Sequence, residues 1–232
     1  MGKSNNSIQK LSFDSELFGY PVGKVRWNSS MTEEEFLIEA KDYQLVYILS
    51  EKPIQFSSTQ ILPVDIKILF EKELSENWNE EEVVPIQKFR DRTAERSIHD
   101  SLLFLGLESG KFSRFNLDPR LTSKEFEKLY ELWIEKALDS GNILVAPDLA
   151  GMVTFEEKEN FAEIGLVAVH PNHRRKSWGR KLIQAVELEI FNRGISKLKI
   201  PTQQSNIPAM NLYEHIGYSI AEKIWVYHFW RN

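Results

Sequence analysis

The chain has 232 residues, of which 42% are hydrophobic and 27% charged, a composition typical of a folded globular protein. Its formal net charge is −5, which disfavours a chain-wide nucleic-acid interface, so we expect no nucleic-acid partner. It contains no cysteine, which excludes disulfides and thiolate nucleophiles, and its five histidines form no HExxH pattern, so we expect no metal.

The first 80 residues predict a smaller N-terminal α/β domain. Short runs rich in β-branched residues predict three strands, over Val22–Trp27, Leu45–Ser50 and Ile66–Phe70. A capping box that begins at Thr32 predicts a helix over about residues 33–41. The acidic run over residues 71–82 has little periodicity and predicts a linker. We therefore divide the chain into a small domain, residues 1–80, and a second domain, residues 81–232.

The second domain predicts the element order β-α-α-β-β-β-α-β-α-β-β. Two helices are expected in succession, one from about Glu95 and one after a capping box at Thr122. The turns near residues 147 and 159 are short enough for antiparallel hairpins. Strands are expected over residues 83–89, 143–146, 149–155, 161–169 and 197–201, a helix over residues 206–217, and two final strands through Ile224 and Trp230.

The stretch from Phe161 to Arg193 carries the strongest pattern of the chain. Its first third alternates as a half-buried strand does, with Ile164, Leu166 and Ala168 on one face and Glu163, Val167 and Val169 on the other. A basic loop follows and leads into an amphipathic helix that begins near Trp178 and stops at Gly194. The free N–H groups and positive dipole end of a helix N-terminus favour phosphate. A basic loop before a helix is also typical of a solvated surface, and neither a P-loop nor a GxGxxG pattern is present.

Residues 174–179, RRKSWG, resemble the motif (Q/R)-x-x-G-x-(G/A) with which GNAT acyl-CoA N-acyltransferases wrap the coenzyme A pyrophosphate. Ser177 stands where the motif has its first glycine. The resemblance covers the chain from Val83 onward and implies an α/β (α+β) GNAT fold, with a mixed, mostly antiparallel central sheet flanked by helices. It also implies acyl-CoA as the donor. The residues it assigns to acyl-CoA binding are Val167, Ala168, Val169, Arg174, Arg175, Lys176, Ser177, Trp178, Gly179, Arg180, Lys181, Asn206 and Ala209.

Two residues are catalytic candidates. Asn206, Ala209 and Tyr213 fit an N-x-x-A-x-x-x-Y stretch that borders the cofactor in GNAT enzymes, and the resemblance implies that Tyr213 protonates the departing thiolate. A phenol with a pKa of ~10 stays protonated at neutral pH, although such a tyrosine is also typical of a helix packed on a core. Glu163, in the string FAEI, stands where GNAT histone acetyltransferases carry a base. A solvent-facing strand-edge carboxylate, or an enzyme without a dedicated base, stays an alternative.

Further short motifs resemble one GNAT branch, the dTDP-fucosamine acetyltransferases, which act on nucleotide-linked amino sugars. They are FDSELFGYPV over residues 13–22, Ser113-Arg114-Phe115 with Asp118, Trp133-Ile134, and the aromatic run over residues 227–230. The resemblance implies that Ser113, Arg114, Phe115 and Asp118 bind the sugar substrate. The Arg114 guanidinium can bind a diphosphate through two N–H groups, and the Phe115 ring can pack against thymine or a sugar. A surface ion pair at a helix end is the alternative for Arg114.

This branch implies acyl transfer, of an acetyl or a longer group such as 3-hydroxybutyryl, to a dTDP-linked amino sugar in bacterial surface polysaccharide synthesis. The FAEI string leaves open a protein or peptide N-acetyltransferase, and Ser177 leaves open a non-catalytic acyl-CoA-binding module. No apolar run approaches the ~18 residues of a membrane span, so we expect a cytoplasmic protein without a membrane partner. The sequence leaves open the sugar, its amine position and the oligomeric state, including a homodimer.

Overall fold

The computed structural model describes residues 7–75, 87–89 and 96–232, and their contacts divide into two compact units. The first unit contains the described residues up to Lys67, together with Gln203–Ser205 and Lys223–Asn232. The second contains the remainder, from Ile68 to Glu222. The domain boundary predicted at residue 80 lies outside the described residues and stays a prediction.

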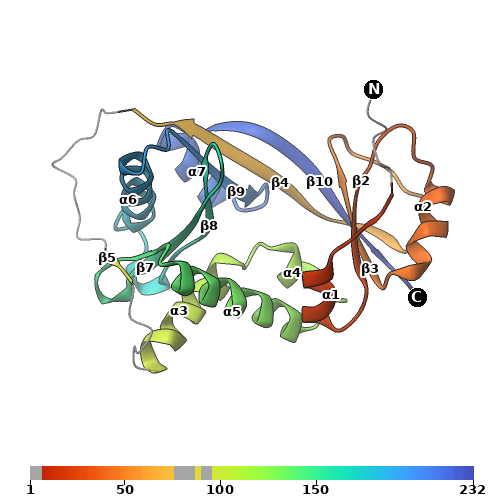
Figure 1. Cartoon of the computed structure of the whole chain (residues 1–232), viewed down its shortest axis with the longest axis horizontal. Helices are drawn as coiled ribbons and strands as arrows, with labels where there is room; N and C mark the ends of the chain where they lie inside the picture. Colours follow the sequence, from red (N-terminus) through yellow and green to blue (C-terminus); the bar gives the residue numbers. More distant parts are fainter. Residues whose placement is uncertain (1–6, 76–86, 90–95) are drawn as a thin grey trace. The chain divides into compact units, whose positions relative to one another are not determined.

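The first unit is a mixed sheet with the strand order β1-β2-β3-β10 (Figure 1). Strand β2 is parallel to β3, whereas β1 and β10 are antiparallel to their neighbours. The unit's elements are β1 (Gln9–Lys10), α1 (Ser12–Phe18), β2 (Val22–Arg26), α2 (Glu33–Glu39), a 3-10 turn (Ala40–Asp42), β3 (Leu45–Ser50), and parts of β4 (Ile61–Glu73) and β10 (Ser219–Trp230).

Helix α2 begins with the predicted capping box. The Thr32 side chain accepts a hydrogen bond from the Glu35 backbone N–H, and the Glu35 carboxylate accepts one from the Thr32 backbone N–H. The helix buries Phe36 in a core formed with Val25, Val46 and Phe229. This packing explains why strands β2, β3 and β10 are apolar toward that face.

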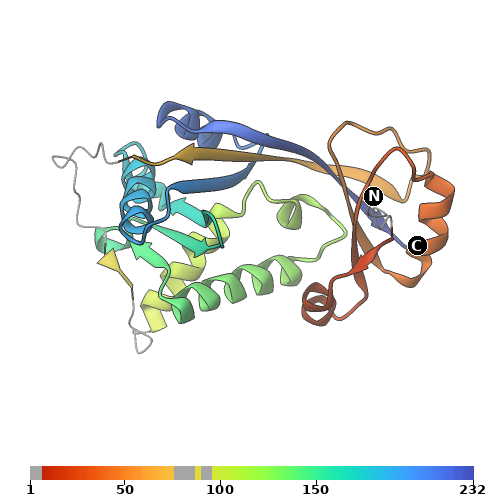
Figure 2. The same cartoon turned by 45° about the horizontal axis from the view of Figure 1, so that its top comes forward.

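The second unit has the strand order β4-β9-β8-β7-β6-β5, antiparallel from β5 to β8 and parallel between β8 and β9. Figure 2 shows α6 along one side of β7 and β8, and α3 and α5 along the other. This arrangement confirms the predicted fold class. The elements are β5 (Gln87–Lys88), α3 (Arg96–Ser109), α4 (Arg114–Leu117), α5 (Ser123–Ser140), β6 (Ile143–Val145), β7 (Gly151–Glu157), β8 (Ala162–Val169), α6 (Trp178–Asn192), β9 (Lys197–Gln203) and α7 (Ile207–His215).

Three predicted boundaries are wrong. The two expected final strands form one strand, β10, because no turn former interrupts residues 219–230. Residues 71–73, expected in a linker, belong to β4, and Glu71 and Glu73 pair with lysines of β9. Residues 76–82 of the expected linker and residues 83–86 of the strand expected over 83–89 lie outside the described residues. Strand β7 begins at Gly151 rather than at residue 149, because Pro147–Leu149 form a 3-10 turn. No helix within the described ranges is long and apolar enough to cross a bilayer.

Candidate active site

Strand β8 carries a bulge at its centre. Val167 pairs with Val153 of β7 and Ile164 pairs with Phe155, so the two residues Gly165 and Leu166 lie opposite the single residue Thr154. The Thr154 hydroxyl accepts a hydrogen bond from the Leu166 backbone N–H at 2.9 Å and so satisfies the displaced amide. A side chain at position 165 would begin 3.0 Å from that hydroxyl, which explains the glycine. Bulges of this kind redirect the strand that follows them.

Beyond the bulge, β8 presents an open edge. The register of β8 with β9 contains the pairs Ala162↔Leu198 and Glu163↔Lys199 and, within the described residues, goes no further. On the other edge, the His170 N–H donates to the Ala150 carbonyl at 2.9 Å. Because alternate residues of an antiparallel pair point their amides in opposite directions, the N–H groups of Val167 and Val169 face away from β7. They can therefore pair with an extended ligand that carries amides of its own.

The open edge ends at the N-terminus of α6, where the backbone adopts a glycine-like conformation. Ser177 has φ 60° and ψ 13°, in the left-handed region that glycine favours, and Arg175 also has a positive φ of 65°. A left-handed residue before the first helical turn aims successive N–H groups at one point, which suits an anion. Gly179, in the first turn of α6, lies close to α7, since a Cβ there would be 3.0 Å from the Leu212 side chain.

The basic side chains of the loop differ in their surroundings. Arg174 donates to the Glu108 carboxylate of α3 at 2.8 Å and to the Val169 carbonyl at 3.3 Å, so it ties the loop to α3. The side chains of Arg175 and Lys176 are exposed, and Trp178 is half-buried with the Lys181 ammonium 5.0 Å from its ring centre. The loop therefore places positive charge around the first turn of α6.

Helix α7 lies beside this loop and carries Tyr213. Asn206 caps the helix by accepting a hydrogen bond from the Ala209 N–H at 3.4 Å, as its position in the sequence predicts. Tyr213 is 2% exposed, and its ring packs edge-on against Phe70 of β4 at 5.5 Å. Burial raises the pKa of Tyr213 above its ordinary value of 10, because a phenolate would lose its hydration there.

Glu163 lies at the closed end of the gap between β8 and β9. It is half-buried, and its register partners are Glu156 on β7 and Lys199 on β9. The alternation expected for β8 is confirmed, since Ile164, Leu166 and Ala168 are buried. The role of Glu163 as a base stays a prediction.

The four residues expected to bind a sugar form a compact turn around α4. Ser113 is buried and caps this helix by accepting a hydrogen bond from the Phe115 N–H at 3.2 Å. Phe115 and Asp118 are also buried, and the Asp118 carboxylate accepts hydrogen bonds from Arg120 at 3.0 and 3.4 Å. Arg114 is half-buried, with its guanidinium 4.3 Å from the centre of the Phe115 ring. Binding of a substrate by these residues stays a prediction.

Comparison with known proteins places this site in a family. The sequence profile of the Acetyltransferase (GNAT) family matches residues 66–218, well over half of the chain, and these residues include β8, the basic loop and α7. The chain belongs to the GNAT acetyltransferase family. The expectation of an acyl-CoA-dependent N-acyltransferase is thereby confirmed at the level of the family.

Individual relatives are distant. A GCN5-related N-acetyltransferase from Sphaerobacter thermophilus superposes with a TM-score of 0.55 and 15% identity, over 89% of this chain and 72% of that one. A conserved protein of unknown function from Staphylococcus epidermidis superposes with a TM-score of 0.65 and 9% identity, over 99% and 93%. The Bacillus subtilis protein YqkA is 33% identical over 76 residues, which are 33% of this chain and 22% of YqkA. The match thus spans less than a quarter of that curated relative, and the likenesses in structure show the fold alone.

The GNAT site contains residues that sequence analysis missed. Thr154 and Gly165 build the bulge, and an isolated glycine within a strand pattern was the available signal for it. Glu187 is 2% exposed and lies on the apolar face of α6 with Val186 and Ile190. Its position in the helical repeat of apolar residues was the available signal that it is buried. Within the described residues, no group of histidines and carboxylates could hold a metal ion.

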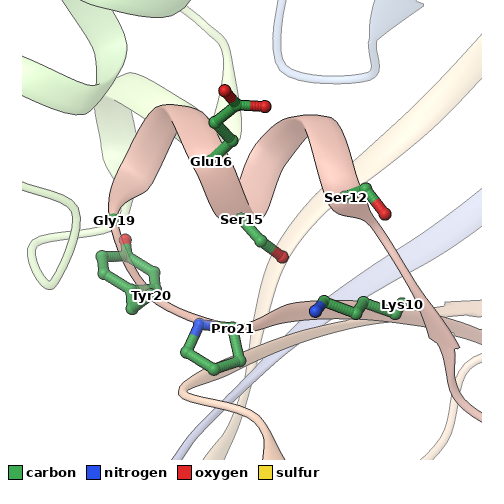
Figure 3. Close-up of a pocket in the computed structure, with 7 residues that line it drawn as sticks. All are labelled: Lys10, Ser12, Ser15, Glu16, Gly19, Tyr20 and Pro21. Carbon is green, nitrogen blue, oxygen red and sulfur yellow. The ribbon is translucent and has the colours of Figure 1, made fainter.

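The first unit contains a separate pocket of about 430 Å³ beside α1. Figure 3 shows the hydroxyls of Ser12 and Ser15 pointing from α1 toward Lys10, while Glu16 points away. The Ser15 hydroxyl already donates to the Leu11 carbonyl and accepts from the Val22 N–H, so it serves the local turn. This pocket overlaps the aromatic segment at residues 13–22, whose role stays a prediction.

Proposed function

We propose that this chain transfers an acyl group from acyl-CoA to the primary amine of a small substrate. One observation carries the proposal: the open edge of β8 leads directly into the left-handed Ser177 and the N-terminus of α6. An extended donor with amides along its arm and a pyrophosphate at its end fits this sequence of groups.

Each part of the site then has a task. The N–H groups of Val167 and Val169 orient the donor arm and stabilise the oxyanion that forms at the thioester carbonyl. The α6 N-terminus and the loop cations bind the pyrophosphate. Acyl-CoA supplies the activated acyl group, and no covalent enzyme intermediate is required.

Proton transfers complete the reaction. The neutral amine forms a C–N bond as the C–S bond breaks, the amine loses a proton to Glu163 or to water, and the thiolate takes a proton from Tyr213. The proton taken from the amine then returns through solvent to the Tyr213 phenolate, which restores the starting state. The raised pKa of Tyr213 keeps the phenol protonated at neutral pH, as a donor must be. Because a coenzyme A thiol is more acidic than this phenol, the proton transfer is coupled to thiolate departure.

For the acceptor we propose the amine of a dTDP-linked amino sugar, used in bacterial surface polysaccharide synthesis. The support is the set of short sequence motifs at residues 13–22, 113–118 and 227–230. Arg114 is the group we assign to the diphosphate, since it is half-buried whereas Ser113, Phe115 and Asp118 are buried. Ser113, Phe115 and Asp118 then act with it by shaping the turn.

The test is thiol release from acetyl-CoA and longer acyl-CoAs with a panel of dTDP- and UDP-linked amino sugars, polyamines and peptides. Turnover with one nucleotide sugar would support the proposal and identify the sugar. Turnover with peptides alone would assign the chain to protein acetyltransferases. Binding of coenzyme A without turnover on any acceptor would instead indicate a binding module.

A further inference from the structure

Near Tyr213, the second unit contains a charged pair in which the Glu187 carboxylate is buried and the Lys72 side chain is half-buried. Lys72 of β4 donates to the Glu187 carboxylate of α6, with 3.0 Å between Nζ and Oε1, and Glu187 is 2% exposed. The Tyr218 hydroxyl donates to the same oxygen at 2.8 Å. A carboxylate buried on an apolar helix face is costly unless such donors compensate it, so the three groups depend on one another.

Two of these residues, Lys72 and Tyr218, also contact the C-terminal end of α7. Lys72 also donates to the Ile216 carbonyl at 3.1 Å, one of the terminal carbonyls that α7 cannot satisfy itself. The chain then turns at Gly217, with φ 90°, and the Tyr218 N–H donates to the Tyr213 carbonyl at 3.0 Å. This Schellman arrangement joins the backbone of Tyr213 directly to the residue that bonds Glu187.

The ring of Tyr213 is fixed by the same strand. Phe70 and Lys72 are two residues apart on β4 and therefore lie on one face of it. Phe70 packs against the Tyr213 ring at 5.5 Å, and the Tyr218 ring lies 6.4 Å from the Tyr213 ring. One face of β4 thus supports both the side chain of Tyr213 and the turn that ends its helix.

Helix α6 contacts α7 at one point and the turn that follows α7 at another. Near its N-terminus, Gly179 abuts Leu212, the residue before Tyr213. Two turns later, Glu187 bonds Tyr218. Because these two contacts lie at different points along α6, they fix both the direction of α6 and its distance from α7 and the following turn. The position of Tyr213 is therefore defined relative to the anion-binding end of α6.

We propose that Lys72, Glu187 and Tyr218 form a positioning network that holds the Tyr213 hydroxyl in register with the acyl-CoA-binding end of α6. The inference rests on the proposed function, in which Tyr213 protonates the leaving thiolate. The three residues touch no reacting atom. They act through Tyr213, by fixing the helix that carries it.

A double-mutant cycle tests this. Tyr218→Phe keeps the ring and removes the bond to Glu187, and we expect kcat to fall about tenfold while KM for acetyl-CoA stays within about twofold, because small displacements of an acid are costly. In a Tyr213→Phe background, the same change should lower kcat by less than about twofold, since no hydroxyl is left to position. Multiplicative effects in the double variant would overturn the inference.

A second variant removes the charges together. Lys72→Met, Glu187→Leu and Tyr218→Phe together leave neither an unpaired buried charge nor an unpaired buried hydroxyl, so the thermal midpoint should stay close to that of the wild type. We expect the same fall in kcat with an unchanged KM for acetyl-CoA, and a folded triple variant with wild-type kcat would overturn the inference. Tyr47→Phe is the matched control, because it removes a buried hydroxyl bonded to the Asp14 carboxylate in the first unit, and kcat should not change.

The outcomes distinguish failure of the positioning network from failure of the proposed function. Absence of thiol release by the wild-type chain with every acceptor would overturn the proposed function, and the inference with it. Wild-type turnover combined with multiplicative effects would overturn the inference alone.

Discussion

At the scale of single residues, Ser177 adopts the left-handed backbone conformation that glycine favours. The residue occupies the left-handed region in which a side chain costs about 1–2 kcal/mol, yet its N–H group is placed as that of glycine would be. This conformational cost concerns a single exposed residue, which directly precedes the 15-residue helix α6. The requirement at this position is therefore a backbone conformation, which serine can adopt and a β-branched residue resists.

Substitution of Ser177 tests this requirement. Ser177→Gly should leave KM for acetyl-CoA unchanged or lower it, with a change in unfolding free energy below about 1 kcal/mol, because relief of strain and the added freedom of the unfolded chain offset each other. Ser177→Val should raise KM at least several-fold. Steady-state kinetics and urea denaturation give both quantities. Equal KM values for the glycine and valine variants would show that the left-handed conformation does not matter for binding.

Tyr213 carries the second prediction at this scale. Tyr213→Phe should lower kcat about 100-fold and leave KM for acetyl-CoA within about twofold, because it removes a general acid without touching the donor site. Because the pKa of Tyr213 is raised, wild-type kcat should not decline through loss of this proton below about pH 10. An unchanged kcat in the phenylalanine variant would remove Tyr213 from the mechanism.

At the scale of elements, the bulge in β8 directly precedes the open edge of that strand, to which we assign the donor. It depends on a single hydroxyl, that of Thr154, which is 6% exposed and accepts from the Leu166 N–H. Without that hydroxyl the amide has no acceptor in a buried place. The strand beyond it, with Val167 and Val169, would then lose its direction.

Thr154→Val is close to isosteric and removes the acceptor. It should lower the unfolding free energy by about 1–3 kcal/mol, the cost of one unsatisfied buried amide, and also raise KM for acetyl-CoA. Thr154→Ser keeps the hydroxyl and should retain wild-type KM. Chemical denaturation and kinetics of the two variants make the comparison, and similar KM values for both would dissociate the bulge from binding.

Sequence patterns predicted the elements of the second unit because its periodicity is strong. The alternation in β8 and the apolar stripe of α6 come directly from packing on a core, and Asn206 and Gly194 mark helix ends by local chemistry. The bulge was not predicted, because its register depends on Thr154, eleven residues before Gly165. The network of Lys72, Glu187 and Tyr218 was not predicted either, since three charged or polar residues from separate elements meet only in the folded chain.

At the scale of the whole molecule, two buried tyrosines couple stability to pH. Burial raises the pKa of Tyr213, and burial together with the Glu187 carboxylate raises that of Tyr218. Both phenols are protonated in the folded and unfolded chain below about pH 10, so their contribution to stability is fully present there. Above that pH the unfolded chain ionises first and stability is lost.

We therefore expect the free energy of unfolding to fall above about pH 10, by up to about 1.4 kcal/mol per pH unit for each of these tyrosines. Urea denaturation between about pH 8 and pH 11 measures the slope. Because lysines also titrate in this range, the informative quantity is the difference from Tyr213→Phe, whose slope should be shallower. Identical slopes would mean that Tyr213 ionises as readily in the folded chain as in the unfolded one.

The pairing of β3 with β10 also has a consequence for how the protein is made. Tyr47 of β3 lies beside His228 of β10, and Tyr227 and Phe229 belong to the core around Phe36. A ribosome releases β3 long before β10, so the first unit cannot close its core until the residues near position 230 have emerged. The first unit therefore cannot fold first during synthesis, as N-terminal domains usually do. Until β10 is synthesised, the edge of β3 that pairs with it stays exposed. We expect chaperones to bind the nascent protein at this stage.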